Sequence, residues 1–185
     1  MIKSWEYQNE YKFLKKDIFK SIDKVLKSGN LFFGNELIKF EKSFLKTNKS
    51  KYGVAVASGT DAIYLSLKAL NIGPGDEVIT VSNTAIPTIS AIRNTGATVK
   101  FIDIRYDYLM DPNKLEKAIS KKTKIIIPVH LYGQSCEMNK ILKIANYHKI
   151  KVVEDCAQAQ GATYNKKKLE LWEPLDVSLF IQLKY

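Results

Sequence analysis

Two acidic residues, Glu154 and Asp155, follow directly on an apolar run that ends at Val153. The run predicts a buried strand, which would place Asp155 at the carboxyl edge of a sheet. Ligands of open α/β sheets bind outside this edge, where a carboxylate can pair with a positively charged ring nitrogen. A carboxylate at a strand end can also cap a helix or remain solvated, so the acid alone does not define a site.

A second candidate site is the small and hydroxylated segment Ser58–Ala62, which follows another apolar run. A helix is predicted to begin here, and the start of a helix has unpaired N–H groups and the positive end of the helix dipole. A phosphate could therefore bind at Gly59, Thr60 and Asp61. The glycine patterns of dinucleotide-binding and nucleoside-triphosphate-binding loops are absent. Ordinary capping by Ser58 or Thr60 is the alternative interpretation.

The histidines and cysteines are weaker candidates for functional residues than the two segments above. His130 follows a third apolar run and could transfer a proton or pack against a ligand, but a single histidine is more often structural, and we assign it no catalytic role. His148 lies near the carboxyl end of a predicted helix, where a histidine interacts favourably with the helix dipole. Cys136 and Cys156 are not in a metal-binding spacing and are expected to be reduced thiols.

Alternating strand and helix patterns position these residues. Two amphipathic helices, 11–27 and 37–45, are predicted before the sheet. The predicted strands are 52–57, 77–81, 99–102, 124–129 and 151–153, and the predicted helices between them are 61–70, 86–95, 113–119 and 137–148. This alternation predicts an α/β fold in which right-handed crossovers build a mainly parallel sheet with helices on both faces.

Composition narrows the class of protein. The 185 residues suffice for one domain with a substantial core, and 45% of them are hydrophobic. The formal charge of +10 suggests an anionic partner, but every basic residue except Arg93 and Arg105 is lysine, whereas base recognition favours arginine. Nucleic acid is therefore not the expected partner. No apolar stretch could span a bilayer and no signal peptide is recognisable, so we expect a cytoplasmic protein without membrane partners.

Taken together, four motifs resemble those of the DegT/DnrJ/EryC1/StrS family of sugar aminotransferases, which depend on pyridoxal 5′-phosphate (PLP). The motifs are Ser58–Ala62, Gly73–Ile79, Pro128–Gly133 and Glu154–Gln158. Their order and spacing extend the resemblance over about residues 10 to 168. The resemblance implies the type I, aspartate-aminotransferase-like, PLP-dependent transferase large domain, incomplete at the carboxyl end.

The resemblance also implies roles for single residues. The cofactor phosphate would bind the backbone at Gly59 and Thr60, beside Asp61, while Asp155 would pair with the pyridinium nitrogen. That carboxylate would keep the ring protonated and so able to accept electrons. Gln158 would approach the phenolic oxygen without adding charge.

For a complete relative, the family resemblance implies a homodimer that transfers an amino group from a glutamate-like donor to a nucleotide-linked keto-sugar. The product would be an aminodeoxy sugar for surface polysaccharide.

Two segments depart from the family pattern. The loop Ser82–Thr88 lacks the aromatic residue that many members place over the cofactor, so Ala85 or Ile86 would cover it less well. Residues 169–185 lack the glycine-rich stretch and the Schiff-base lysine motif. Restoring one nucleotide near the codon for Glu170 would recover that motif in a plausible back-translation. We therefore hypothesise a single-base frameshift, which the DNA downstream of the stop codon would test.

Lys184 falls at the family's catalytic lysine position but has the wrong flanking residues, so we expect a solvated side chain rather than a nucleophile. The expected organisation is a helical segment (1–50), a partial PLP-binding domain (51–168) and an atypical tail (169–185). We expect little or no transaminase activity from this chain alone. The alternative function is a non-catalytic α/β binding protein that docks on an intact aminotransferase subunit.

Overall fold

The computed structural model describes residues 6–48, 50–164 and 167–168. The chain divides into two compact units, residues 1–46 and 47–185, which are considered separately below. The tail 169–185 lies outside the described residues. The hypothesis that a frameshift created this tail therefore concerns residues that the structure does not describe.

The first unit is helical. Helix α1 spans Gln8–Ser28 and ends at Gly29, whose φ of 68° is the left-handed conformation that glycine adopts at little cost. Helix α2 spans Asn35–Asn48. Lys24 of α1 pairs with Glu36 in the first turn of α2, with 2.6 Å between Nζ and Oε1. Both helices predicted for this segment are confirmed, and each is longer than predicted.

A four-stranded parallel sheet forms the centre of the second unit. Its strands are β1 (Glu77–Val81), β2 (Thr98–Ile102), β3 (Thr123–Ile126) and β4 (Lys151–Val152). Their order in the sheet is β2-β1-β3-β4. In the register, Val78 of β1 lies opposite Val99 of β2, and Ile126 of β3 lies opposite Val152 of β4. Parallel strands need crossover connections, and helices supply them here.

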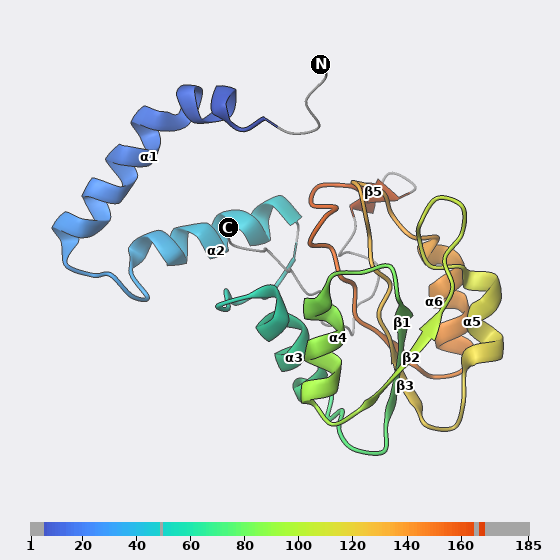
Figure 1. Cartoon of the computed structure of the whole chain (residues 1–185). Helices are drawn as coiled ribbons and strands as arrows, with labels where there is room; N and C mark the ends of the chain where they lie inside the picture. Colours follow the sequence, from blue (N-terminus) through green and yellow to red (C-terminus); the bar gives the residue numbers. More distant parts are fainter. Residues whose placement is uncertain (1–5, 49, 165–166, 169–185) are drawn as a thin grey trace. The chain divides into compact units, whose positions relative to one another are not determined.

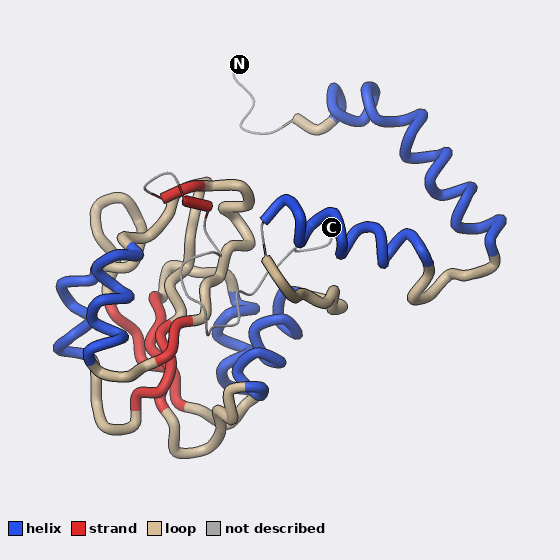
Figure 2. Tube along the Cα trace, turned by 180° about the vertical axis from the view of Figure 1, so that it is seen from behind, coloured by secondary structure: helices blue, strands red, loops and turns tan. Residues whose placement is uncertain are grey.

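Two layers of helices cover the sheet. Helices α3 (Gly59–Ala69) and α4 (Ile86–Asn94) lie on one face, and α5 (Pro112–Ala118) and α6 (Met138–Tyr147) lie on the other (Figures 1 and 2). Because both faces of the sheet are covered, the central strand β1 is buried from Val78 to Val81, and its neighbour β3 is buried at Ile125 and Ile126. The predicted α/β fold with helices on both faces of a parallel sheet is confirmed.

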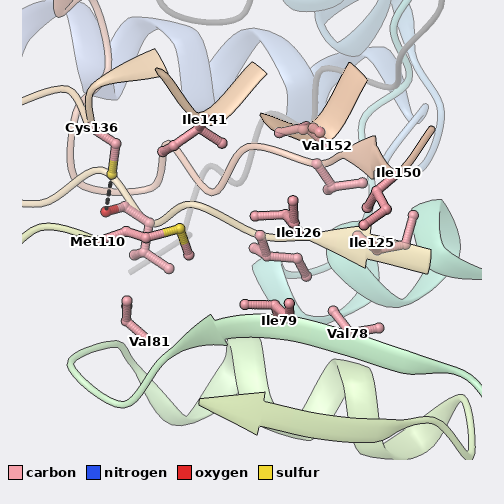
Figure 3. Close-up of a cluster of buried hydrophobic side chains, with 14 of the residues drawn as sticks. Val78, Ile79, Val81, Met110, Ile125, Ile126, Cys136, Ile141, Ile150 and Val152 are labelled. Carbon is pink, nitrogen blue, oxygen red and sulfur yellow. Dashed lines mark hydrogen bonds between the residues drawn. The ribbon is translucent and has the colours of Figure 1, made fainter. Parts of the chain in front are cut away.

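The hydrophobic core lies on both sides of the sheet. Ile79 of β1, Ile126 of β3 and Ile141 of α6 are fully buried. Figure 3 shows Ile79 and Val78 facing Ile125 and Ile126 of the neighbouring strand, with Val152 beyond them. A thiol–carbonyl contact, 3.3 Å from Cys136 Sγ to Val129 O, closes this cluster near the carboxyl edge. The packed strands therefore form a rigid support for the loops that follow them.

One predicted strand is wrong. Residues 52–57 are not a strand in the structure, and Tyr52 and Val54 are each 79% exposed. A strand needs a neighbouring strand to satisfy its N–H and C=O groups, and none of the described strands pairs with this segment. A short antiparallel pair that was not predicted, β5 (Thr163–Tyr164) and β6 (Lys167–Lys168), follows the parallel sheet.

Among the described residues, no helix has the length and apolar character needed to cross a membrane.

Candidate functional site

Asp155 lies just past the end of β4, at the carboxyl edge of the sheet. Its backbone continues the parallel pairing, with Asp155 N donating to Pro128 O (3.0 Å) and Asp155 O accepting from His130 N (2.9 Å). Only 5% of the residue is exposed. The sequence-based placement of this acid at the sheet edge is confirmed, and the backbone pairing fixes its main chain there.

Each oxygen of the Asp155 carboxylate accepts one hydrogen bond within the protein. The backbone N–H of Ala157 donates to Oδ1 (3.2 Å), and the Thr88 hydroxyl donates to Oδ2 (2.8 Å). The Thr84 hydroxyl lies 2.9 Å from the Thr88 hydroxyl, which it can reach as a donor. A carboxylate has about four acceptor positions, so Asp155 retains capacity for a further donor.

Thr88 is a site residue that sequence reasoning missed. It is 1% exposed and lies in the first turns of α4, after the loop that follows β1. Its position 67 residues before Asp155 leaves no local sequence signal for their contact. The signal that could have identified it is a threonine on the apolar face of a predicted helix. A polar side chain that is buried there needs a hydrogen-bond partner, which marks Thr88 as a candidate for contact with a polar site.

Burial raises the pKa of Asp155 above the usual range for an aspartate, although the hydrogen bonds from Thr88 and Ala157 act in the opposite direction. Within the described ranges, no lysine or arginine side chain forms an ion pair with this carboxylate. A buried carboxylate without a cationic partner is unfavourable. The site is therefore electrostatically suited to a ligand that brings a positive charge or an N–H donor.

His130 and Glu154 form a buried pair beside Asp155. His130 is fully buried, and its Nε2 lies 3.0 Å from Glu154 Oε2. The backbone N–H of Cys136 donates to Nδ1 of the same ring (3.0 Å). Because Nδ1 accepts a hydrogen bond, the ring proton belongs on Nε2, where it is donated to Glu154. His130 is thus a structural residue that holds the loops after β3 and β4 together.

Cys156 extends this cluster, since its thiol, the His130 ring and the Glu154 carboxylate offer ligand atoms within 4.8 Å of one another. Such a donor set could hold a metal ion in principle. With the proton on Nε2, however, His130 presents no lone pair toward the other two groups. The hydrogen-bonding pattern therefore favours a structural cluster over a metal centre. Cys136 and Cys156, both among the described residues, form no disulfide bond.

The predicted phosphate-binding segment forms the first turn of α3. The Ser58 side chain caps the helix by accepting from Asp61 N (3.1 Å), and its hydroxyl donates to Asp61 Oδ2 (2.8 Å). Ala62 N donates to Ser58 O, which leaves the N–H groups of Gly59 and Thr60 to bind a ligand. Capping and phosphate binding are thus compatible here, but the amide and carboxylate of Asp61 are already engaged.

The start of α3 and Asp155 share one edge of the sheet. Helix α3 is joined to the beginning of β1 by a short turn, so it runs antiparallel to β1 and begins at the carboxyl edge. Gln158 is exposed in the loop that follows Asp155, and its backbone carbonyl accepts from Gly133 N (3.0 Å). Ile86 at the start of α4 is 79% exposed, which leaves it open to contact a ligand. Lys184 lies outside the described residues.

Comparison with known proteins identifies the family. The DegT/DnrJ/EryC1/StrS aminotransferase family model matches residues 12–173. The chain belongs to this family. A curated member, dTDP-3-amino-3,4,6-trideoxy-alpha-D-glucose transaminase from Micromonospora megalomicea subsp. nigra, is 43% identical over 159 residues, which are 85% of this chain and 42% of that protein.

Solved structures of this aminotransferase family support the fold. The S. venezuelae DesV structure matches with a TM-score of 0.85 and 38% identity over 89% of this chain and 45% of that one. NtdA from Bacillus subtilis, solved with bound cofactor PMP, matches with a TM-score of 0.78 and 41% identity over 80% of this chain and 34% of that one. The chain thus spans less than half the length of these relatives.

If PLP is the ligand of this site, replacing Thr88 with valine is expected to weaken its binding about fivefold, because the Asp155 carboxylate would lose the donor that orients it, at a cost of about 1 kcal/mol. Thr80→Val is the matched control. Thr80 is also fully buried, but its hydroxyl donates to Ile127 O within the sheet (2.9 Å). Both variants should lose similar stability in urea unfolding, and only Thr88→Val should lose affinity. Equal affinities would contradict the orienting role of Thr88.

Proposed function

We propose that this chain provides the PLP-binding part of a nucleotide-sugar aminotransferase. The observation that carries the proposal is the buried Asp155 carboxylate, which is held by Thr88 and Ala157 and has no lysine or arginine partner among the described residues. A protonated pyridine ring would supply both the missing cation and an N–H donor. Family membership, and a relative solved with bound PMP, support the same ligand.

Three groups of the chain fit the cofactor. Asp155 would accept the ring N–H, the free amides of Gly59 and Thr60 would bind the phosphate at the start of α3, and Gln158 would lie near the phenolic oxygen. Asp61 would favour the phosphate only indirectly, by fixing the helix start through Ser58. When bound, PLP supplies an electron-accepting ring for amino-group transfer. The chain's own contribution is to hold the ring proton at Asp155 and to orient the phosphate.

The proposed substrate class follows the relatives. The curated relative described above is named as a transaminase of a dTDP-linked sugar, and another, from Bacillus subtilis, is named as a spore coat polysaccharide biosynthesis protein. By analogy, a glutamate-like amino acid would give its amino group to a nucleotide-linked keto-sugar used for surface polysaccharide. A homodimer is the proposed assembly of an intact member.

The proposal separates binding from catalysis. Amino-group transfer needs a lysine whose pKa is lowered and whose amine is aimed at the cofactor by a packed pocket. Lys184 has flanking residues unlike those of the family motif. We therefore propose that the 185-residue chain binds PLP but has little or no transaminase activity by itself.

A titration of the purified chain with PLP, followed by borohydride reduction, tests both parts. Equilibrium dialysis should detect saturable PLP binding, and mass spectrometry after reduction should find no cofactor mass on Lys184. Absence of saturable binding would contradict the cofactor assignment and favour a non-catalytic binding protein. A reduced adduct on Lys184 would instead contradict the proposed inactivity.

A further inference from the structure

Two exposed tyrosines meet above the carboxyl edge of the sheet. Their rings, Tyr108 and Tyr132, have centroids 6.2 Å apart and an interplanar angle of 86°, an edge-to-face contact. The residues are 58% and 62% exposed, respectively. In an edge-to-face pair, the ring that offers its edge keeps both faces open. The pair therefore presents aromatic faces to solvent in a fixed arrangement.

The backbone at both tyrosines is strained. Tyr108 has φ 68° and Tyr132 has φ 56°, in the left-handed region that side-chain-bearing residues rarely adopt. Neither position uses glycine or asparagine, which adopt this conformation more easily. Such strain persists where the surrounding structure imposes it, and it concentrates at ligand-binding sites. Two strained tyrosines in mutual contact indicate a feature that the fold maintains for more than local stability.

The loops that carry the pair are braced. Tyr108 lies in the loop after β2, where Tyr108 N donates to Arg105 O (3.0 Å) and Asn83 Nδ2 donates to Tyr108 O (3.1 Å). The Arg105 guanidinium also reaches Glu137 in the segment after β3, with 2.8 Å between Nη1 and Oε2. The pair is thus fixed in the absence of a ligand, which lowers the entropy cost of binding.

The sheet order places the pair next to the proposed cofactor site. Strand β1 lies between β2 and β3, so the contact between Tyr108 and Tyr132 crosses the end of β1. The residue after Tyr132, Gly133, is tied to the loop of Asp155 through the Gln158 carbonyl. Adjacent strands lie about 4.8 Å apart, so β2 and β4 are separated by roughly 14 Å. That span suits a molecule whose sugar reacts at the cofactor while its base binds farther along the edge.

We propose that Tyr108 and Tyr132 form a stacking platform for the base of the nucleotide-linked sugar. This inference rests on the proposed function, whose substrate it specifies further. An aromatic face stacks on a flat base without needing particular hydrogen bonds, and such stacking makes a large contribution to nucleotide affinity. The platform would hold the nucleotide end of the substrate while Asp155 holds the cofactor ring.

Calorimetric titration of the full chain with thymidine diphosphate tests the platform. Tyr108→Asn and Tyr132→Asn remove one ring each and substitute a residue that tolerates positive φ, so both variants should fold. Each should bind thymidine diphosphate about tenfold more weakly. Tyr147→Asn is the matched control, because Tyr147 is 80% exposed and also makes an edge-to-face contact, with His148, the residue that follows α6.

The comparison ligands separate the possible outcomes. Tighter binding of thymidine diphosphate than of pyrophosphate or glucose 1-phosphate supports a base site, whereas equal or weaker binding overturns it. Unchanged affinity in the tyrosine variants overturns the platform, as does a shift in oligomeric state in place of an affinity loss. PLP binding is measured in parallel on the same proteins. Its absence from the unmodified chain would count against the proposed function, while the tyrosine-dependent nucleotide binding is judged separately.

Discussion

Replacing Asp155 with asparagine is expected to weaken PLP binding by roughly 30-fold, because a charge-assisted hydrogen bond to the ring nitrogen contributes about 2 kcal/mol. Asparagine has nearly the same shape, and its side-chain oxygen can still accept from the Ala157 amide. The variant therefore removes the charge while changing the packing little. Equilibrium dialysis with PLP measures the effect directly.

The same variant has a second readout in the absence of cofactor. Burial raises the pKa of Asp155, so the folded state holds this proton more tightly than the unfolded state. Such a carboxyl group favours folding at low pH, and this contribution is lost as the pH rises through its folded-state pKa. Asp155→Asn should therefore gain stability relative to the unmodified protein at pH 7 and lose that advantage below about pH 4.

Thermal unfolding at both pH values, with and without PLP, tests this opposition between stability and binding. The expected pattern is a variant that is more stable without cofactor but is stabilised less when PLP is added. A variant with unchanged PLP affinity would remove the main support for Asp155 as the ring partner. A variant that is less stable at pH 7 would show that the charged carboxylate does not destabilise the empty site.

Replacing His130 with alanine is expected to lower the free energy of unfolding by about 3–5 kcal/mol, because the buried Glu154 carboxylate would be left without its hydrogen-bond donor. Glu154 is only 7% exposed and would lose its Nε2–H donor, while the N–H of Cys136 would lose its acceptor. A cavity would add to the cost, since His130 is fully buried. Urea unfolding measures the loss.

Two further variants make the His130 result interpretable. His130→Gln keeps an amide that can donate to Glu154 and should recover part of the lost stability. His148→Ala is the control, because His148 is partly exposed and its Nε2 lies 3.7 Å from the exposed Glu116. The control should cost less than 1 kcal/mol, as exposed pairs do. Similar losses for His130→Ala and His148→Ala would refute a stabilising role for the buried pair.

Local sequence patterns determined most of the secondary structure. The strand Glu77–Val81 was predicted at its observed bounds, and the helix predicted over 86–95 is Ile86–Asn94. These elements have strong periodicity and clear boundaries, because side-chain burial repeats every two residues in strands and every 3.6 in helices. The prediction failed at residues 52–57, whose apolar pattern fits a strand but which pair with none of the described strands.

The sequence by itself also determined that Asp155 stands at the end of an apolar strand and that a helix begins within the segment Ser58–Ala62. These are consequences of short segments, and the structure retains both. Only the tertiary structure decided what the acid contacts: Thr88 comes from a helix 67 residues earlier, and no local pattern encodes that distance.

The same holds for the other contacts that define this edge. The proton position on His130 depends on the backbone N–H of Cys136, and the meeting of Tyr108 with Tyr132 depends on two loops that flank β1. Local sequence sets the periodicity of each element, but the order of strands in the sheet sets which loops become neighbours. Asp155 is thus identifiable from sequence as a strand-end acid, and the packing around it makes it a buried carboxylate suited to a cationic ring.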